Sequence, residues 1–441
     1  TQARSIGFGM YSVRLTAGTS LDTARAALAA RPGVAFAEAD PIKRLLRTPN
    51  DPEYAQQYGP AKIGAEFVWN KTTGAPDFVV AVIDSGVDYT HPDLAPNMWV
   101  NPGEVAGNNV DDDGNGYVDD IHGWDDPRPD AGDDHGTHVA GTVGAAGNNG
   151  LGVAGVSWNV KIMALNFLGS GANSGSISAQ VEAINYMLSM GVKLSNNSYG
   201  GAGTSQAEEL AIAAARDAGH IFVTAAGNEA QDNDTNPSFP SNYARDYDNV
   251  VAVAATDAND QLADFSSFGG TNVTVAAPGV RIYSTIPGGG YGFLDGTSMA
   301  SPHVAGALAL YWSANPTSTS QEVISAMKLA VDRLPQLDGM VSTGGRLNVA
   351  NMFDLSFGGP VVVDAPPGTE VVRLLGVNGV TEQSFRPHPG FLGGIVAAAG
   401  DVTGDEVHDV VTAATFGGHV KVFDGATGAE LKSFYAFEGY Q

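Results

Sequence analysis

Three short segments of the sequence carry the side-chain types that nucleophilic catalysis needs. Asp84 directly follows an apolar run, His135 stands in the segment DHGTHVAG, and Ser298 stands in the segment GTSMASPHVAG. A serine hydroxyl becomes a strong nucleophile when a neutral imidazole removes its proton, and a carboxylate fixes the tautomer of that imidazole. Ser298 also precedes the apolar helical run 300–312, so we expect it at a positive helix end that favours developing negative charge.

Each segment has a plainer interpretation when it stands alone. A strand-end Asp is often a turn residue, a His–Gly pair is common in loops, and Thr–Ser before a helix is most often a helix cap. All three together, in the order Asp, His, Ser, favour a catalytic triad. We reject a zinc site of Asp133, Asp134, His135 and His138, because a glycine separates the histidines and the glutamate of zinc protease motifs is absent. His138 and His303 are interpreted as packing residues.

The rest of the central region alternates between two patterns. Short apolar runs that end in small or polar residues are typical of strands buried on both faces of a sheet. Five such runs are present, at 79–83, 160–168, 192–194, 221–226 and 250–255. The segments 176–190 and 207–218 are predicted helices, each followed by glycine. This alternation predicts an α/β fold with a doubly wound parallel sheet, whose site lies where Asp84, Ser198 and Asn228 follow their strands.

A fourth segment, Ala225–Glu229 (AAGNE), completes a resemblance to a known family. With the three segments above, it makes residues 48–355 similar to the subtilases, the subtilisin-like serine proteases. The resemblance implies a subtilisin-like fold and hydrolysis of peptide bonds in proteins or peptides. It also implies a role for each motif residue: Asp84 orients the base, His135 is the general base and then the acid, Ser298 is the nucleophile, and Asn228 donates to the oxyanion beside the Ser298 backbone N–H.

The same resemblance implies how the substrate binds. Subtilases hold a peptide as an added β-strand, and the matching segments here are Ser198-Tyr199-Gly200 on one side and Gly169 to Gly171 on the other. The primary pocket is expected near residues 198–200, 225–227 and 240–241. These segments hold no acidic residue, which favours a large apolar substrate side chain, although Asp246 and Asp248 are close in sequence.

An acidic segment predicts calcium. Its oxygen-bearing side chains recur at relative positions 1, 3, 5 and 9, with glycine at position 6 and a carbonyl at position 7, as in a calcium loop. The residues are Asp111, Asp113, Asn115, Tyr117 and Asp119. Position 12 holds His122 in place of glutamate, so Asp120 or water would substitute. The alternative is a solvated acidic loop.

A second calcium site follows from the resemblance alone, chiefly to the thermitase-like subtilases. The matching ligands are the side chains of Asp51, Asp93 and Asn149 and the carbonyl oxygens of Ala146, Leu151 and Val153. Asp125 and Asp130 are candidates for a third, weaker ion.

The carboxyl-terminal region differs from the rest of the chain. Residues 360–441 are rich in Gly, Val and Phe and show a weak repeat with a period near 50, which suggests a β-propeller blade and part of another. One segment resembles the calcium loop of integrin-type FG-GAP repeats, with ligands at Asp401, Thr403, Asp405 and Asp409. An adhesive or scaffold protein is therefore the alternative function. A missing triad member would favour it, and none is missing.

The amino-terminal region is predicted to be strand, helix, strand, with the second strand at 34–39. Residues 1–47 hold 6 of the 14 arginines and resemble the carboxyl half of a subtilase propeptide, a likeness carried by the segment 32–40. Such a segment assists folding and then blocks the cleft as an intramolecular inhibitor. We expect self-cleavage near Leu45-Leu46-Arg47.

Composition limits the partners but leaves the compartment open. Lys and Arg number 22 against 48 Asp and Glu, a net charge of −26, which disfavours nucleic acid and anionic membranes as partners. The chain has no cysteine and no apolar run of the ~20 residues that a membrane span needs. The motifs and the resemblance to subtilases together predict a secreted, calcium-stabilised serine endopeptidase whose signal peptide is not part of the printed sequence.

Overall fold

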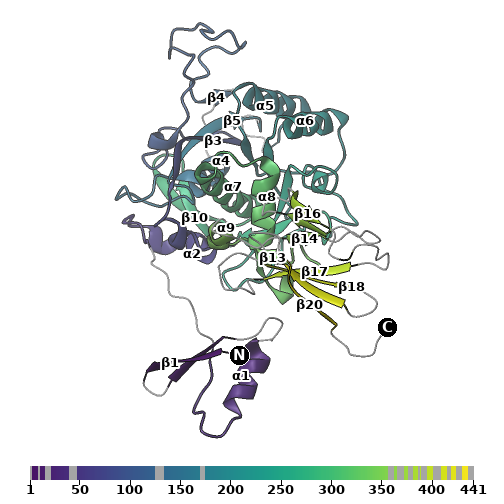
Figure 1. Cartoon of the computed structure of the whole chain (residues 1–441). Helices are drawn as coiled ribbons and strands as arrows, with labels where there is room; N and C mark the ends of the chain where they lie inside the picture. The colour runs from purple at the N-terminus through teal and green to yellow at the C-terminus, as the bar shows by residue number, and fades with distance from the viewer. Residues whose placement is uncertain are drawn as a thin grey trace.

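Figure 1 shows the computed structural model of the chain. It describes residues 2–7, 10–14, 21–38, 47–124, 134–168, 174–355, 362–364, 372–375, 381–385, 388, 395–400, 409–414, 419–423 and 430–435. Seven residues assigned above to substrate or calcium lie outside the described residues: Gly169, Gly171, Asp125, Asp130, Asp401, Thr403 and Asp405.

A nine-stranded sheet forms the centre of the molecule, in the order β12-β13-β9-β8-β7-β6-β3-β5-β4. Its strands are β3 (Gly74–Asp84), β4 (Gly123–Trp124), β5 (Asn159–Asn166), β6 (Leu194–Asn197), β7 (Ile221–Ala225), β8 (Val250–Thr256), β9 (Val275–Pro278), β12 (Asp332–Arg333) and β13 (Gly345–Arg346). Every neighbouring pair is parallel except β12–β13. All five predicted strand runs fall on this sheet, so the predicted parallel α/β fold is confirmed.

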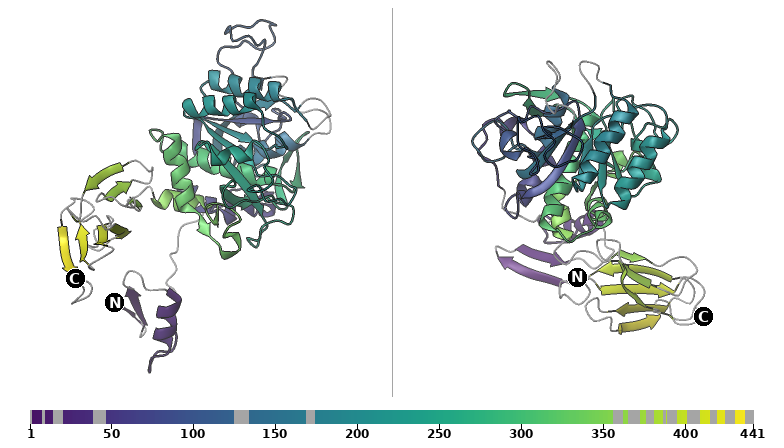
Figure 2. Two further views of the ribbon diagram at one scale, coloured as in Figure 1. Left: turned by 90° about the vertical axis from the view of Figure 1, so that its right-hand side faces the viewer. Right: turned by 90° about the horizontal axis from the view of Figure 1, so that it is seen from above.

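Helices cover both faces of the sheet (Figures 1 and 2). On one face lie α4 (His135–Gly144) and α7 (Thr297–Ala314), and on the other α5 (Ile177–Ser189) and α6 (Gln206–Asp217). Smaller elements complete this region: η1 (Tyr54–Gln56), α2 (Gly59–Lys62), α3 (Ala65–Val68), η2 (Ala95–Asn97), η3 (Ser241–Arg245), the hairpin β10 (Ile282–Ile286) and β11 (Gly290–Leu294), α8 (Ser320–Ala330), η4 (Pro335–Leu337) and α9 (Val349–Leu355). None of the described helices is long and apolar enough to cross a membrane.

Local sequence explains where α5 and α6 begin and end. The hydroxyls of Ser176 and Ser205 cap their first turns by accepting from backbone N–H groups. Gly191 and Gly219 follow the helices with φ of 70° and 74°, the left-handed conformation that glycine adopts without strain. The two predicted helices are therefore present within one residue of their expected ends.

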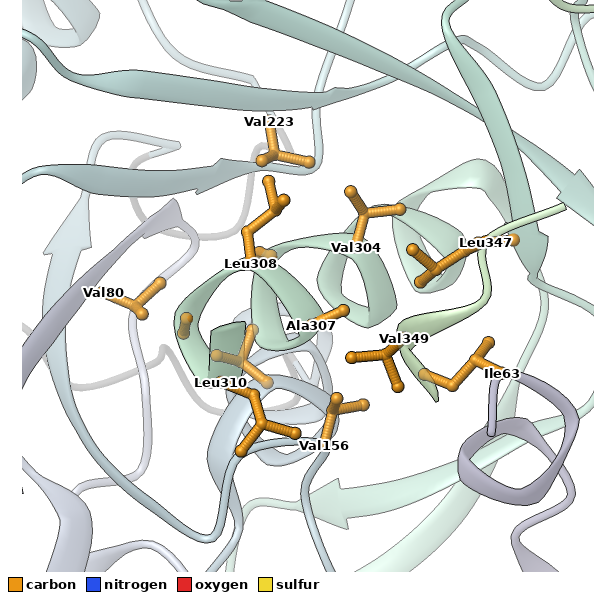
Figure 3. Close-up of a cluster of buried hydrophobic side chains, with 14 of the residues drawn as sticks. Ile63, Val80, Val156, Val223, Val304, Ala307, Leu308, Leu310, Leu347 and Val349 are labelled. Carbon is orange, nitrogen blue, oxygen red and sulfur yellow. The ribbon is translucent and has the colours of Figure 1, made fainter. Parts of the chain in front are cut away.

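Helix α7 is the centre of the larger core. Residues 297–312 are all buried, as expected for a helix that is apolar around its whole circumference. Figure 3 shows Val304, Leu308 and Leu310 of this helix among side chains from the sheet and from flanking segments, including Val80, Val156, Val223, Leu347 and Val349. Such packing holds the amino end of α7, and therefore Ser298, in one position.

The amino-terminal region departs from the prediction. Its described elements are β1 (Gln2–Gly7), β2 (Met10–Arg14) and α1 (Leu21–Ala29), with β1 antiparallel to β2. The predicted strand at 34–39 is wrong for residues 34–38, which form no regular element. An alternating pattern becomes a strand only when a partner pairs with it, and Val34 and Phe36 remain 37% and 59% exposed.

The described carboxyl-terminal residues form two antiparallel sheets. One contains β14 (Val362–Asp364), β15 (Val372–Leu375) and β16 (Thr381–Phe385). The other contains β17 (Ile395–Gly400), β18 (Asp409–Ala414), β19 (His419–Phe423) and β20 (Glu430–Tyr435), paired in chain order. Asp409 is the first residue of β18. The described residues of this region therefore form small antiparallel sheets, and the propeller-type repeat stays a prediction.

Candidate active site

Asp84 is the last residue of β3, at the point where the order of the sheet reverses. Strand β3 pairs with β5 on one side and with β6 on the other, so the chain crosses β3 between these two strands. Ligand sites of doubly wound sheets form at such crossings, outside the carboxyl ends of the strands. The Asp84 carboxylate is fully buried, and its Oδ1 accepts the Ser85 backbone N–H at 2.8 Å.

His135 opens α4 and lies against Asp84. Its Nδ1 is 2.7 Å from Asp84 Oδ1, while the side chain keeps 31% of its surface exposed. Gly136 makes this approach possible, since a Cβ there would lie 2.1 Å from the Gly86 carbonyl oxygen. The buried carboxylate therefore fixes one ring nitrogen of an imidazole that remains partly exposed.

Ser298 is the second residue of α7. Its hydroxyl donates to the Ser198 carbonyl oxygen at 3.2 Å, and the Ser198 hydroxyl donates to the Ser298 carbonyl oxygen at 2.8 Å. Pro302 explains the second contact. Proline has no backbone N–H, so the helix leaves the carbonyl four residues earlier without its usual donor, and Ser198 supplies one.

Asn228 lies beside the start of α7. Its Oδ1 accepts the Thr297 backbone N–H at 2.8 Å and the Thr297 hydroxyl at 2.9 Å. A Cβ placed on Gly296 would lie 3.5 Å from both Asn228 Nδ2 and the Ser298 backbone nitrogen. Both nitrogen donors therefore lie close to Gly296, at the start of α7.

A cleft of about 770 Å³ opens beside these residues. Its described walls come mainly from the segment after β6, the start of α6, the end of β5 and residues next to α7. They are Ser85, Asp134, His135, Phe167, Leu168, Ser174, Gly175, Ile177, Gln180, Ser198, Tyr199, Gly200, Gly201, Ala202, Gly203, Glu208, Phe239, Leu294, Asp295 and Met299. Ser198, Tyr199 and Gly200 thus line a cleft that His135 also borders.

Comparisons with known proteins agree with this geometry. The model of the Subtilase family matches residues 75–352. The chain is 37% identical over 306 residues to thermitase of Thermoactinomyces vulgaris, which covers 68% of this chain and 97% of thermitase. The chain is a subtilase. It is also 38% identical over 326 residues to a thermophilic serine proteinase of Bacillus sp. (strain AK1), covering 74% of each chain. A halolysin-like extracellular serine protease of Natrialba magadii is 37% identical over 291 residues, which are 66% of this chain and 50% of that protein.

As a subtilase, the chain is a serine endopeptidase, as its sequence predicted.

His138 and His303, interpreted as packing residues, are both buried. The His138 Nε2 is 2.9 Å from the Ile282 carbonyl oxygen, and the His303 Nδ1 is 2.8 Å from the Met299 carbonyl oxygen. Burial lowers the pKa of each to about 4, so both rings are neutral at pH 7. His135 and His138 face different partners, unlike two ligands of one zinc ion.

The segment 146–153 of the subtilase wraps around two buried carboxylates. Asp51 accepts three backbone N–H groups, from residues 148, 149 and 150. Asp93 accepts the Asn149 side-chain amide at 2.8 Å and the Val153 backbone N–H at 2.9 Å. Burial raises the pKa of Asp51, and the charge of Asp93 adds to that shift. No Lys or Arg pairs with either carboxylate among the described residues. Asn149 turns its amide nitrogen toward Asp93, and its Oδ1 accepts the Leu151 backbone N–H at 2.7 Å, so calcium at this site stays a prediction.

The acidic loop brings together a carboxylate set that differs from the predicted one. Oxygens of Glu104, Asp111 and Asp113 lie within 4.8 Å of one another. The Asp119 carboxylate instead accepts backbone N–H groups of Gly107, Asn108 and Asn109 and so holds the loop together. Asn115 donates to Asp113 and Asp120 through its amide nitrogen, at 3.1 and 2.8 Å, and its Oδ1 accepts the Tyr117 backbone N–H at 2.7 Å.

Sequence reasoning missed two members of these sites. Glu104 stands seven residues before Asp111, outside the spacing that identified the loop. Glu208 lines the cleft from the first turn of α6, eight residues after the end of the inspected segment 198–200. The fold brings these side chains to their sites. The one local signal for Glu208 is its place three residues after the capping residue Ser205, which marks it as a first-turn acid of α6.

Proposed function

We propose that Ser298, His135 and Asp84 carry out peptide bond hydrolysis in this subtilase. The 2.7 Å contact between His135 Nδ1 and Asp84 Oδ1 carries the proposal, because it leaves Nε2 of the same ring as the proton acceptor. The Ser298 hydroxyl attacks the substrate carbonyl carbon and gives its proton to His135. That proton then passes to the leaving amine, and a water molecule hydrolyses the resulting acyl-enzyme by the same route.

The oxyanion of the tetrahedral intermediate is assigned to two donors. Asn228 Nδ2 and the Ser298 backbone N–H converge near Gly296, and the amino end of α7 adds its positive dipole. The peptide substrate lies along residues 198–200 as an added strand. Gly169 and Gly171 are proposed for its other side on the family resemblance.

The test is the Ser298→Ala variant with Ser313→Ala as the matched control. Ser313 lies in the same helix, and within the described part of the chain its hydroxyl bonds only to the Leu310 carbonyl oxygen, at 3.1 Å. We expect Ser298→Ala to abolish casein hydrolysis without lowering the melting temperature, and Ser313→Ala to cleave casein at the wild-type rate. A serine-directed inhibitor should label wild type and Ser313→Ala alone. Casein cleavage by purified Ser298→Ala would refute the assignment.

We also propose two calcium sites in the described region. Asp51, Asp93 and Asn149 hold one ion, with the carbonyl oxygens of Ala146, Leu151 and Val153. Asp111, Asp113 and Asn115 hold the other, with the Tyr117 carbonyl oxygen and either Asp119 from the sequence pattern or Glu104 from the carboxylate cluster. Calcium would neutralise carboxylates that face each other, and would thereby stabilise the folded chain.

The flanking regions have distinct proposed roles in a secreted protein. Residues 1–47 are the propeptide, 48–355 the protease domain, and 360–441 a blade-like β-repeat module that binds or spaces, with a calcium loop at Asp401, Thr403, Asp405 and Asp409. The antiparallel sheet β17–β20 supports the last assignment, since propeller blades are four-stranded antiparallel sheets. The name of the extracellular relative from Natrialba magadii supports secretion.

A further inference from the structure

Glu208 is a buried carboxylate in the wall of the cleft. It is the third residue of α6 and only 3% exposed, yet it lines the same cleft as His135 and Ser198. Glutamate at this helical position commonly bonds back to the N–H of the capping residue. Here the side chain turns instead toward α5, where its Oε1 accepts the Gln180 amide at 2.8 Å.

The polar contacts of Glu208 leave its charge uncompensated. Gln180, itself 2% exposed, also donates to the Tyr199 hydroxyl at 3.1 Å. A hydrogen bond from Tyr243 assists the carboxylate, but desolvation dominates and raises the pKa of Glu208. No Lys or Arg within the described part of the chain forms an ion pair with it. Buried carboxylates are normally paired with a cation, because an isolated buried charge is costly.

The acidic side chains of the described cleft lining are not balanced by basic ones. Asp134, Glu208 and Asp295 are its carboxylates, and it includes no Lys or Arg. An aromatic pair lies at the same cleft, with the rings of Phe167 and Tyr199 at 4.5 Å between centroids. The cleft thus offers an apolar surface for the stem of a long side chain and a buried acid for its charged end.

We propose that Glu208 determines substrate specificity by pairing with a Lys or Arg side chain of the bound peptide. The peptide would supply the cation that the protein itself does not. This inference rests on the proposed function, since it requires that peptides bind in this cleft. It adds a preference for a basic residue at one substrate position, next to the apolar preference expected for the primary pocket.

The test compares Arg with citrulline, its neutral analogue of the same shape, at each position of fluorogenic peptides cleaved by the processed enzyme. At one position we expect wild type to prefer Arg by roughly tenfold in kcat/KM, equivalent to ~1.4 kcal/mol. Glu208→Gln keeps the shape and the oxygen that accepts from Gln180, and should bring this ratio close to one. Because each variant is measured against itself, a general loss of activity cancels from the ratio.

Two further variants separate a role in specificity from a role in folding. Glu209→Gln changes the same charge one residue along α6, but Glu209 is exposed and accepts the Tyr247 hydroxyl at 3.0 Å, so it should keep the wild-type ratio. Glu208→Asp retains the charge and should retain a preference for Arg. If Glu208→Gln fails to fold, the single variants Glu208→Asp and Glu209→Gln still test the proposal. Loss of the preference for Arg in both of these single variants would overturn it.

The pH dependence of the ratio supplies a second readout. Gln180, Tyr199, Tyr243 and Glu209 lie close to Glu208, and burial raises the pKa of Tyr199 and of Tyr243, so neither is charged below pH 9. The other titratable side chains of the described cleft lining are Asp134, His135 and Asp295, and all three are unchanged in Glu208→Gln. The preference for Arg should therefore strengthen as pH rises through the raised pKa of Glu208, and should stay flat in Glu208→Gln.

Wild type that cleaves peptides with no preference for Arg at any position, or a preference that survives in Glu208→Gln, would refute the inference while leaving the triad intact. Wild type that cleaves no peptide would instead contradict the proposed function.

Discussion

Asn228 has only one end of its amide left to bind a substrate oxygen, because the other end is already bonded. Thr297 donates to Asn228 Oδ1 through both its backbone N–H and its hydroxyl, so Nδ2 is the end left to bind an oxyanion. Ground-state substrate needs this donor less than the transition state does. The expected consequence is a loss in kcat with little change in KM.

We predict that Asn228→Ala lowers kcat by roughly 100–1000-fold, the range typical of one oxyanion donor. Steady-state kinetics on a fluorogenic peptide would measure it. Active-site titration with a serine-directed inhibitor is the control, because the variant should still be folded and its Ser298 should still react with the inhibitor. A loss of less than about tenfold, or a loss confined to KM, would mean that Asn228 does not stabilise the oxyanion.

Buried histidines make the stability of the fold depend on pH. His138, His220 and His303 each have a pKa lowered by burial to about 4, against an ordinary value of 6.5. Between these two values the unfolded chain binds protons that the folded chain does not, so stability falls as pH decreases from 6.5 toward 4. Above pH 6.5 these residues are neutral in both states and add no dependence.

We predict that the melting temperature of inactive Ser298→Ala decreases across this window, with about three protons taken up on unfolding from these histidines. His220→Gln in the same background should remove about one of them. His220 is chosen because its contacts, to the Val192 carbonyl oxygen and the Ser195 hydroxyl, lie away from the cleft lining. Identical pH profiles for the two proteins would contradict the assignment.

At the scale of elements, the sequence predicts what is local. Strands β3, β5, β6, β7 and β8 come from apolar runs, and α5 and α6 from capping serines and terminal glycines, each of which acts within a few residues. The strand expected at 34–39 failed because a strand also needs a distant partner. The cleft acid Glu208 was missed for a similar reason, since its side chain meets Gln180 only after α5 and α6 pack together.

The segment around Asp51 and Asp93 gives a prediction at the same scale. Chelation should lower the melting temperature of Ser298→Ala, because an ion that binds only the folded chain stabilises it by mass action. Asp51→Asn should reduce the difference between calcium-loaded and chelated protein. Asp217→Asn, a change at a 70% exposed acid, should leave that difference unchanged. An equal response to chelator in all three proteins would exclude calcium at Asp51.

Charge is distributed unevenly over the whole molecule. Residues 1–47 hold seven basic and three acidic residues, a net charge of +4, whereas the remainder carries −30. Opposite charges at this scale attract, and the attraction weakens as salt screens it. A propeptide of this charge would bind its protease domain more tightly than a neutral segment of the same shape.

This asymmetry and the triad together predict self-processing. Purified full-length chain should cut itself near Leu46 at a rate independent of protein concentration, because the segment and Ser298 belong to one molecule. Ser298→Ala should stay full length, and Ser313→Ala should be processed normally.

The released segment should then inhibit the mature enzyme. Its inhibition constant should rise with sodium chloride, because counter-ions screen the attraction between the segment, with a net charge of +4, and the remainder of the chain, with a net charge of −30. Amino-terminal sequencing of the processed wild type locates the cut. Processing of Ser298→Ala at the wild-type rate, or a new amino terminus beyond Asp51, would show that another protease makes the cut or that residues 1–47 are not the inhibitor.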